Sequence, residues 1–144
     1  MGLSIFRRIP DAVRAALEAE GIVHLEELVT AVVSTRYIRM PSLYARGRLS
    51  RGKGSIAITR KRLYVHTTWT GQVLVGQLIN IAWDQPEMDA LTFSIDEKKR
   101  RLVIEIAEIS RIRNDAEGGF KVALGCADPP ATLPLIEDLR RPRS

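Results

Sequence analysis

The chain of 144 residues has the length of one domain, and its composition, 45% hydrophobic and 27% charged, is that of a folded protein rather than a disordered segment. Its 22 Lys and Arg residues outnumber the 17 Asp and Glu residues, which gives a formal net charge of +5. One cysteine excludes an intrachain disulfide framework and indicates a reducing, cytoplasmic location, and no apolar run approaches the roughly 18 residues of a membrane-spanning helix.

The first predicted element is an N-terminal helix. Ile9, Val13 and Leu17 recur at helical spacing. Pro10 suits a first turn and Gly21 a helix stop. The arginines of this segment could lie on an anionic membrane or bind a partner, but two glutamates reduce its positive charge. We therefore expect the helix to cover an open end of a barrel, as an extension over residues 1–20.

Hydrophobic alternation with a period of two begins after this helix. It predicts a long strand over about Ile22 to Arg39. Met40 to Gly54, rich in glycine, serine and arginine, reads as a loop. A hairpin follows, with strands at 55–59 and 63–67 around a turn of three basic residues.

The second half of the chain continues the strand pattern. Gly76 interrupts a bent strand over Gln72 to Trp83. Alternating strands are predicted around Phe93, Ile104 and Val122. The total is about seven antiparallel strands in a mainly β domain.

A C-terminal helix is predicted to close the chain. Asp128 can cap it, and Pro129 suits its first position. Leu135, Ile136 and Leu139 supply an apolar stripe. Pro134 is compatible with this helix only if the helix begins one turn later, because proline inside a helix removes a backbone hydrogen bond.

One segment carries a resemblance to a known family. Residues 54–65, GSIAITRKRLYV, resemble the hairpin "G-x-hydrophobic-x-hydrophobic-T-x-x-R-L" of the GRAM-like and bacterial branch of the pleckstrin-homology (PH) superfamily. The resemblance implies a PH-like, partly open barrel over residues 21–140 with a C-terminal capping helix, in a single domain. It also implies a non-catalytic binding or scaffolding module, without a cofactor, for lipid headgroups, phosphoinositides or peptides.

The basic residues are concentrated beside this segment. Nine of the 22 fall between Arg36 and Arg62, and no Asp or Glu occurs from Leu28 to Trp83. The remaining 13 basic and 17 acidic residues give −4, against +9 for the basic block. Such a field attracts an anionic partner without identifying it.

The resemblance implies an anion site in this block. In phosphoinositide-binding members, basic residues at the end of the first strand, in the first loop and at the start of the second strand surround the phosphates. Arg36 or Arg39 stands at the place of the leading lysine, with the basic pair in the loop and Lys53 where the second strand begins. Because the leading residue is Arg and the pair lies inside the loop, inositide selectivity stays open. The candidate set is Arg36, Arg39, Arg46, Arg48, Arg51 and Lys53.

Three other interpretations of the basic block remain open. It could be a solvated surface that keeps the protein soluble and protects a sheet edge. Sheet edges or the N-terminal helix could also bind a protein partner or a second copy of the chain. In the third interpretation the basic block binds nucleic acid, since aromatic residues that could stack on bases are interleaved with the charges: Tyr37, Tyr44, Tyr64 and Trp69.

Catalytic and metal sites are not predicted. A phosphate-loop motif at 47–53 fails because Gly54 occupies the Ser or Thr position and a strand, not a helix, follows. A Cys126 nucleophile would need His24 or His66 beside it, and each of the three is better explained as structural. No zinc pattern occurs, and the acidic residues of one turn match no calcium-loop spacing: Asp84, Glu87 and Asp89.

Overall fold

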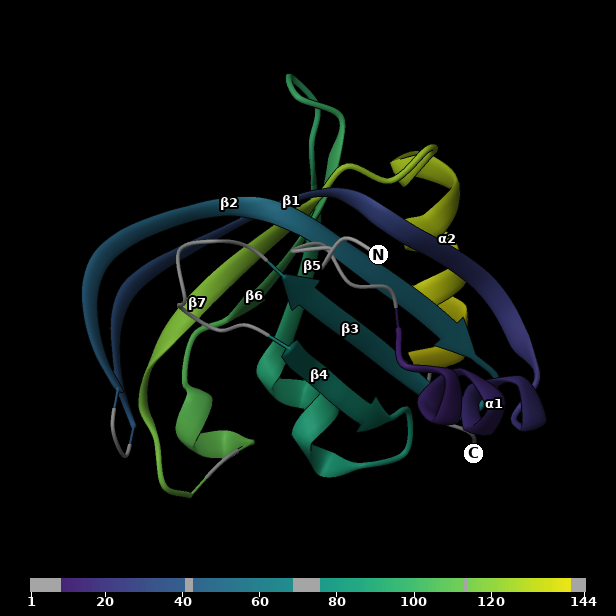
Figure 1. Cartoon of the computed structure of the whole chain (residues 1–144), viewed down its shortest axis with the longest axis horizontal. Helices are drawn as coiled ribbons and strands as arrows, with labels where there is room; N and C mark the ends of the chain where they lie inside the picture. The colour runs from purple at the N-terminus through teal and green to yellow at the C-terminus, as the bar shows by residue number, and fades with distance from the viewer. Residues whose placement is uncertain (1–8, 41–42, 69–75, 113, 141–144) are drawn as a thin grey trace, which may run out of the picture.

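A computed structural model describes residues 9–40, 43–68, 76–112 and 114–140 and contains one curved antiparallel sheet with a helix on each face (Figure 1). The seven strands of this part lie in the order β4-β3-β2-β1-β7-β6-β5, so that β4 and β5 are the open edges. The prediction of a mainly β fold with two terminal helices is confirmed. The elements are α1 (Asp11–Ala19), β1 (Ile22–Met40), β2 (Leu43–Thr59), β3 (Arg62–Thr68), β4 (Gly76–Ala82), η1 (Pro86–Ala90), β5 (Leu91–Asp96), β6 (Arg101–Ile106), η2 (Ile109–Arg111), β7 (Glu117–Leu124) and α2 (Pro129–Arg140).

β1 and β2 form a long curved hairpin, the ribbon that arches across Figure 1. The loop predicted over Met40 to Gly54 is therefore wrong, since β2 already begins at Leu43. Its glycines and serines lower the local strand preference, but β1 offers a hydrogen-bonding partner along the whole segment. Gly54 shows why a small residue stands in this strand: an added Cβ would lie 3.0 Å from Leu124 and 3.1 Å from Ala31.

The main core lies on the inner face of the sheet. Ile56 and Ile58 of β2 are fully buried there with Leu102 and Ile104 of β6. α2 packs against β5 and β6, and its Ile136 is buried in the same cluster. These residues are the alternating apolar positions that the sequence pattern identified.

The helix α2 begins at Pro129, the first position that the sequence predicted, and contains Pro134. The condition that Pro134 requires a start one turn later is wrong. Pro134 is exposed, and the buried Thr132 and Ile136 flank it. Burial of the apolar face of α2 therefore offsets the backbone hydrogen bond that the proline removes.

The helix α1 covers part of the outer face of the sheet. Leu17 of α1 and the preceding Ile9 form a second buried cluster with Ala57 of β2 and Tyr64 of β3. The expectation that this helix packs against the domain is correct, but it lies on the sheet face rather than over an open end. None of the described helices is long and apolar enough to cross a membrane.

Candidate functional site

The described basic residues of the β1–β2 hairpin point away from the core. Ala31 and Val33 of β1 are buried, so Val32 between them faces outward. Arg51 lies opposite Val32 and is exposed. Lys53, two residues further along β2, faces the same side and is half-buried. The outer face of the hairpin is therefore positively charged at these positions.

Arg39 extends this charge toward the turn of the hairpin. Its neighbour Ile38 is fully buried in the same core as Ala31 and Val33, because the irregularity of β1 between Thr35 and Tyr37 shifts the alternation. The exposed Arg39 therefore faces outward as well. Leu49, 58% exposed, lies two residues before Arg51 on the same face. We call the set Arg39, Leu49, Arg51 and Lys53 the ribbon face.

The ribbon face is too long to surround one phosphate. Arg51 is level with Val32, which precedes Arg39 by seven residues in β1. At about 3.3 Å per residue, the two guanidinium-bearing positions are roughly 23 Å apart along the strand. Arg51 and Lys53, in contrast, are two residues apart on one strand and face the same side. The arrangement suits an extended anionic surface better than a single phosphate.

Three further residues of the predicted set lie in the same hairpin. Arg46 pairs with Tyr37 and Arg48 pairs with Thr35 in the β1–β2 register. The side chains of Arg36, Arg46 and Arg48 lie outside the described part of the structure. The prediction that this basic pair sits in a loop is wrong, because both residues belong to β2. For the same reason Lys53 is the eleventh residue of β2 and does not begin it.

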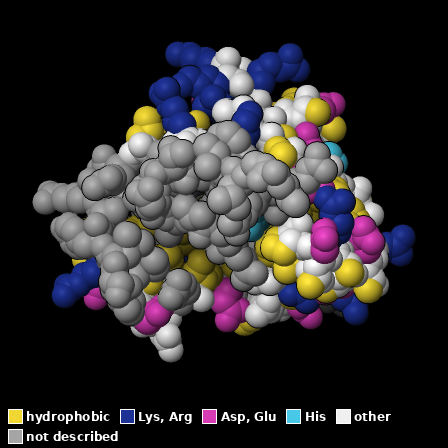
Figure 2. Space-filling model, viewed as in Figure 1, with side chains coloured by type: hydrophobic (Ala, Val, Ile, Leu, Met, Phe, Trp, Pro, Cys, Tyr) yellow, Lys and Arg dark blue, Asp and Glu magenta, His cyan; other side chains and the backbone are white. Residues whose placement is uncertain are grey.

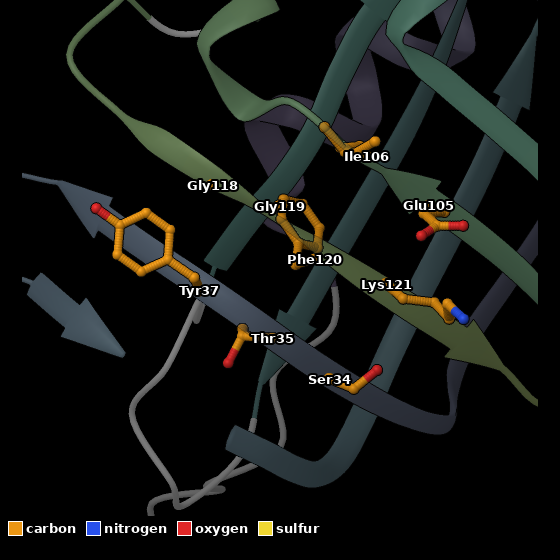
Figure 3. A pocket seen from close by; sticks show the side chains of 10 residues that line it. Ser34, Thr35, Tyr37, Glu105, Ile106, Gly118, Gly119, Phe120 and Lys121 are labelled. Carbon is orange, nitrogen blue, oxygen red and sulfur yellow. The ribbon is translucent and has the colours of Figure 1, made fainter. Parts of the chain in front are cut away.

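A groove of about 430 Å³ is lined by residues of β1, β7 and β6 (Figure 3). It opens above Gly119, where an added Cβ would lie 2.5 Å from the carbonyl oxygens of Ile106 and Ala107. Lys121 lines it and lies opposite Glu105 in the β6–β7 register. Because Lys121 and Glu105 offset one another, the groove does not extend the positive surface.

Tyr37 stands at the edge of this groove and is fixed in place. Its hydroxyl donates a hydrogen bond to Glu117 at 3.2 Å. Tyr64, another of the aromatic residues considered for base stacking, is only 2% exposed, beneath α1. Burial prevents the Tyr64 ring from stacking on a base, and the half-buried Tyr37 ring is anchored at its hydroxyl. The side chains of Tyr44 and Trp69 lie outside the described residues.

The basic residues that are close together in the sequence lie at opposite ends of the long strand β2. Arg60 and Lys61 form the β2–β3 turn and Arg62 begins β3, at the other end of β2 from Arg46. Arg62 is neutralised there: its Nε and Nη2 donate to the carboxylate of Glu20 at 2.8–2.9 Å. This guanidinium also holds the pKa of Glu20 below its usual value. Arg62 therefore has a structural role.

A second basic cluster lies at the tip of the β5–β6 hairpin. Lys98, Lys99 and Arg100 are exposed there, and Arg101 begins β6. Asp96 shapes the tip by accepting hydrogen bonds from the backbone N–H groups of Lys98 and Lys99. The hairpin projects from the sheet, and dark blue side chains gather over it in Figure 2. The run of four cations was visible in the sequence, but only the fold shows that it protrudes.

His24 and Cys126 both contact the carboxylate of Glu26, and this arrangement is unsuited to nucleophilic catalysis. His24 Nε2 lies 2.8 Å from one carboxylate oxygen of Glu26, and the backbone N–H of Ala127 donates to the other at 2.7 Å. Cys126 is buried, and burial together with the Glu26 charge raises the pKa of its thiol to about 12. A nucleophile needs a neighbouring base and a lowered pKa, so this network ties β1 to the start of α2 rather than activating the thiol.

The described residues contain no group of three or more His, Cys, Asp or Glu side chains placed to hold a metal ion. Asp84, Glu87 and Asp89 belong to the β4–η1 turn and the helix η1. Comparison of the chain with protein-family models, with curated proteins and with solved structures finds no match. The function must therefore be argued from the geometry of the surfaces.

Proposed function

We propose that this chain is a non-catalytic, PH-like binding module that attaches peripherally to anionic membranes through the ribbon face. Seven antiparallel strands, open edges at β4 and β5, and a C-terminal helix packed on β5 and β6 agree with the architecture that the resemblance implies. In this proposal the protein is cytoplasmic and needs no cofactor. Fold alone does not fix a ligand, so the assignment depends on the surface.

The observation that carries the proposal is the outward display of Arg51 and Lys53 on β2, a strand that contains no carboxylate, together with Arg39 on β1, whose partner in β7 is Glu117. No Asp or Glu occurs from Leu28 to Thr59, which includes all of β2. The cations are spread along the strand, as a bilayer with many headgroups requires. Guanidinium groups bind phosphate oxygens bidentately, and each basic residue near an anionic membrane contributes about 1 kcal/mol.

Leu49 favours a membrane over nucleic acid as the partner. It is a large apolar side chain, 58% exposed, among these cations. An apolar residue flanked by basic ones suits the boundary between headgroups and acyl chains. Base stacking has less support, because Tyr64 is buried and the Tyr37 hydroxyl is hydrogen-bonded to Glu117.

Vesicle sedimentation tests the proposal. The wild type should pellet with phosphatidylcholine vesicles that contain phosphatidylserine, should stay in solution with pure phosphatidylcholine, and should be released as salt rises. The double variant R51Q/K53Q should bind about 30-fold more weakly, which corresponds to the loss of about 2 kcal/mol. L49S should weaken binding about fivefold with little change in salt dependence.

The matched control removes two charges elsewhere. K98Q/K99Q, at the β5–β6 tip, should change vesicle binding less than about threefold if the ribbon face contacts the membrane. Equal losses from both double variants would reduce the binding to a general electrostatic field. Tighter binding to a single-stranded oligonucleotide than to anionic vesicles would replace the proposal with the nucleic-acid alternative.

A further inference from the structure

A second hollow lies at the opposite end of β2 from the hairpin turn. It has a volume of about 800 Å³, and its lining comes from the β2–β3 turn, the start of β3, the β4–η1 turn, η1 and the C-terminal end of α2. That volume is in the range of small-molecule sites in proteins, about 300–1,000 Å³. Nothing in the ribbon face contributes to it, so any ligand here is independent of membrane binding.

The two walls of this hollow carry opposite charges. Arg60 and Lys61 of the β2–β3 turn are exposed on one side, and Asp84 and Asp89 are exposed on the side of the β4–η1 turn. Among the described residues, none of these four side chains forms an ion pair. The hollow therefore presents two positive and two negative groups to a ligand.

The remaining cations of the lining are held by the protein itself. Arg62 is bound to Glu20, and its Nη1 donates to Asn80 at 2.9 Å. The guanidinium of Arg140 lies over the ring of Phe93, 5.3 Å from its centroid. Arg62 is neutralised by Glu20, whereas Arg140 keeps its charge over the ring. A simple anion would gain at the cations and be repelled by Asp84 and Asp89. A ligand that carries both charges satisfies both walls.

An apolar surface lies between the charged walls. Trp83 is half-buried, and its indole N–H donates to the carbonyl oxygen of Thr59 at 2.9 Å, which fixes the ring. The half-buried Leu139 of α2 lines the same hollow. Such a surface can accept an apolar side chain of a ligand whose polar ends reach the two walls.

The size of the hollow sets the length of that ligand. Taken as a cube, 800 Å³ is roughly 9 Å across. An extended peptide spans about 3.3–3.6 Å per residue, so two residues reach roughly 7 Å and three reach roughly 10 Å. We propose that the hollow binds a short zwitterionic peptide of two or three residues, with its carboxylate at Arg60 and Lys61 and its ammonium group at Asp84 and Asp89.

Fluorescence titration with three related probes tests the proposal. Trp83 is one of two tryptophans, so the variant W69F leaves it as the only reporter. Alanyl-leucine should produce a saturable change in Trp83 emission, whereas N-acetyl-alanyl-leucine, which lacks the positive charge, and alanyl-leucinamide, which lacks the negative charge, should each bind about tenfold more weakly. Saturation-transfer NMR on the wild type gives the same ranking without a substitution.

Paired variants assign each end of the peptide to its wall. R60Q/K61Q should abolish the preference for alanyl-leucine over its amide, and D84N/D89N should abolish the preference over the acetylated form. The control E97Q/K98Q, a neutralised pair at the β5–β6 tip, should leave all three affinities unchanged. The proposal is overturned if folded protein gives no saturable signal with alanyl-leucine up to about 10 mM in either assay, or if the three probes bind equally.

Discussion

Replacement of Glu20 by Gln tests the contact that joins α1 to the β2–β3 turn. The Glu20 carboxylate accepts hydrogen bonds from Nε of Arg62 at 2.8 and 2.9 Å, and the Nη2 nitrogen lies 2.8 Å away. The Thr59 hydroxyl donates to the same carboxylate at 3.1 Å. Glutamine keeps the shape of the side chain but removes the charge and turns its NH₂ group toward donors.

The expected loss of stability follows from the burial of the pair. The side chains of Glu20 and Arg62 are 17% and 31% exposed, so solvent screens them less than a surface pair. Hydrogen bonds to charged groups contribute about 1.5–3 kcal/mol, of which the neutral amide retains a part, so Glu20→Gln should lower the free energy of unfolding by about 1.5 kcal/mol. A chain of 144 residues has an unfolding entropy of roughly 0.3 kcal/mol/K, so Tm should fall by about 5 °C.

The pH dependence of this loss identifies the charge as its cause. Hydrogen bonding to Arg62 is the largest influence on the pKa of Glu20 in the folded state and holds it below the usual value of 4.5. The stabilisation is therefore complete above the unfolded-state pKa and disappears as pH falls through the folded-state pKa. Urea unfolding at a series of pH values should show a constant gap between wild type and variant from pH 7 to about 5, closing below that.

The control for this experiment is Glu18→Gln, an exposed residue of the same helix, which should change stability by less than about 0.5 kcal/mol. Equal losses from the two variants, or a gap that stays constant to pH 3, would refute the argument from the Arg62 contact.

Three further changes probe the backbone and the thiol. Gly118→Ala should lower the free energy of unfolding in urea by about 3 kcal/mol or more, because the residue has φ +98° and its Cβ would lie 1.8 Å from the carbonyl oxygen of Tyr37 in β1. Gly125→Ala, whose Cβ would make ordinary contacts at 3.4 Å, should lower it far less. Pro134→Ala should raise Tm by restoring a hydrogen-bond donor inside α2, with a gain of about 1–3 kcal/mol, and Pro130→Ala in the first turn should have little effect; equal shifts would contradict this account. Cys126 should react with iodoacetamide at pH 8 far more slowly in native protein than in urea, because burial raises its pKa to about 12; comparable rates would disprove its burial.

The regular strands were predictable because the residues of each strand alternate between apolar and polar. Leu102, Ile104 and Ile106 alternate with polar neighbours, and all three are fully buried in β6. The segment 43–54 was not predictable in this way. Its glycines, serines and arginines carry no alternation, and it is a strand because β1 pairs with it over its whole length. Local patterns miss a strand that depends on a partner.

The candidate surface was predicted in part for a related reason. The sequence indicated that Arg39, Arg51 and Lys53 belong to a basic region, and their exposed or half-buried positions on the hairpin agree with a surface. It could not indicate that Arg62 pairs with Glu20, 42 residues away, or that the β5–β6 tip protrudes. Both facts depend on tertiary contacts.

Strand geometry explains why clustering in the sequence did not produce one compact site. A helix folds consecutive charges back over a short length, at about 1.5 Å per residue, whereas a strand separates them by about 3.3 Å per residue and alternates their faces. In β2 this spreads the basic block from the hairpin turn to Thr59. Several carboxylates meet it at the far end, through Glu20, Asp84 and Asp89, whereas Glu117 of β7 lies opposite Arg39 near the hairpin turn. The two ends of one basic segment therefore present different chemistry. One end offers a mainly positive surface, and the other offers a hollow that combines cations with the carboxylates of Asp84 and Asp89, so variants at Arg51 and Lys53 and variants at Arg60 and Lys61 should separate the two activities.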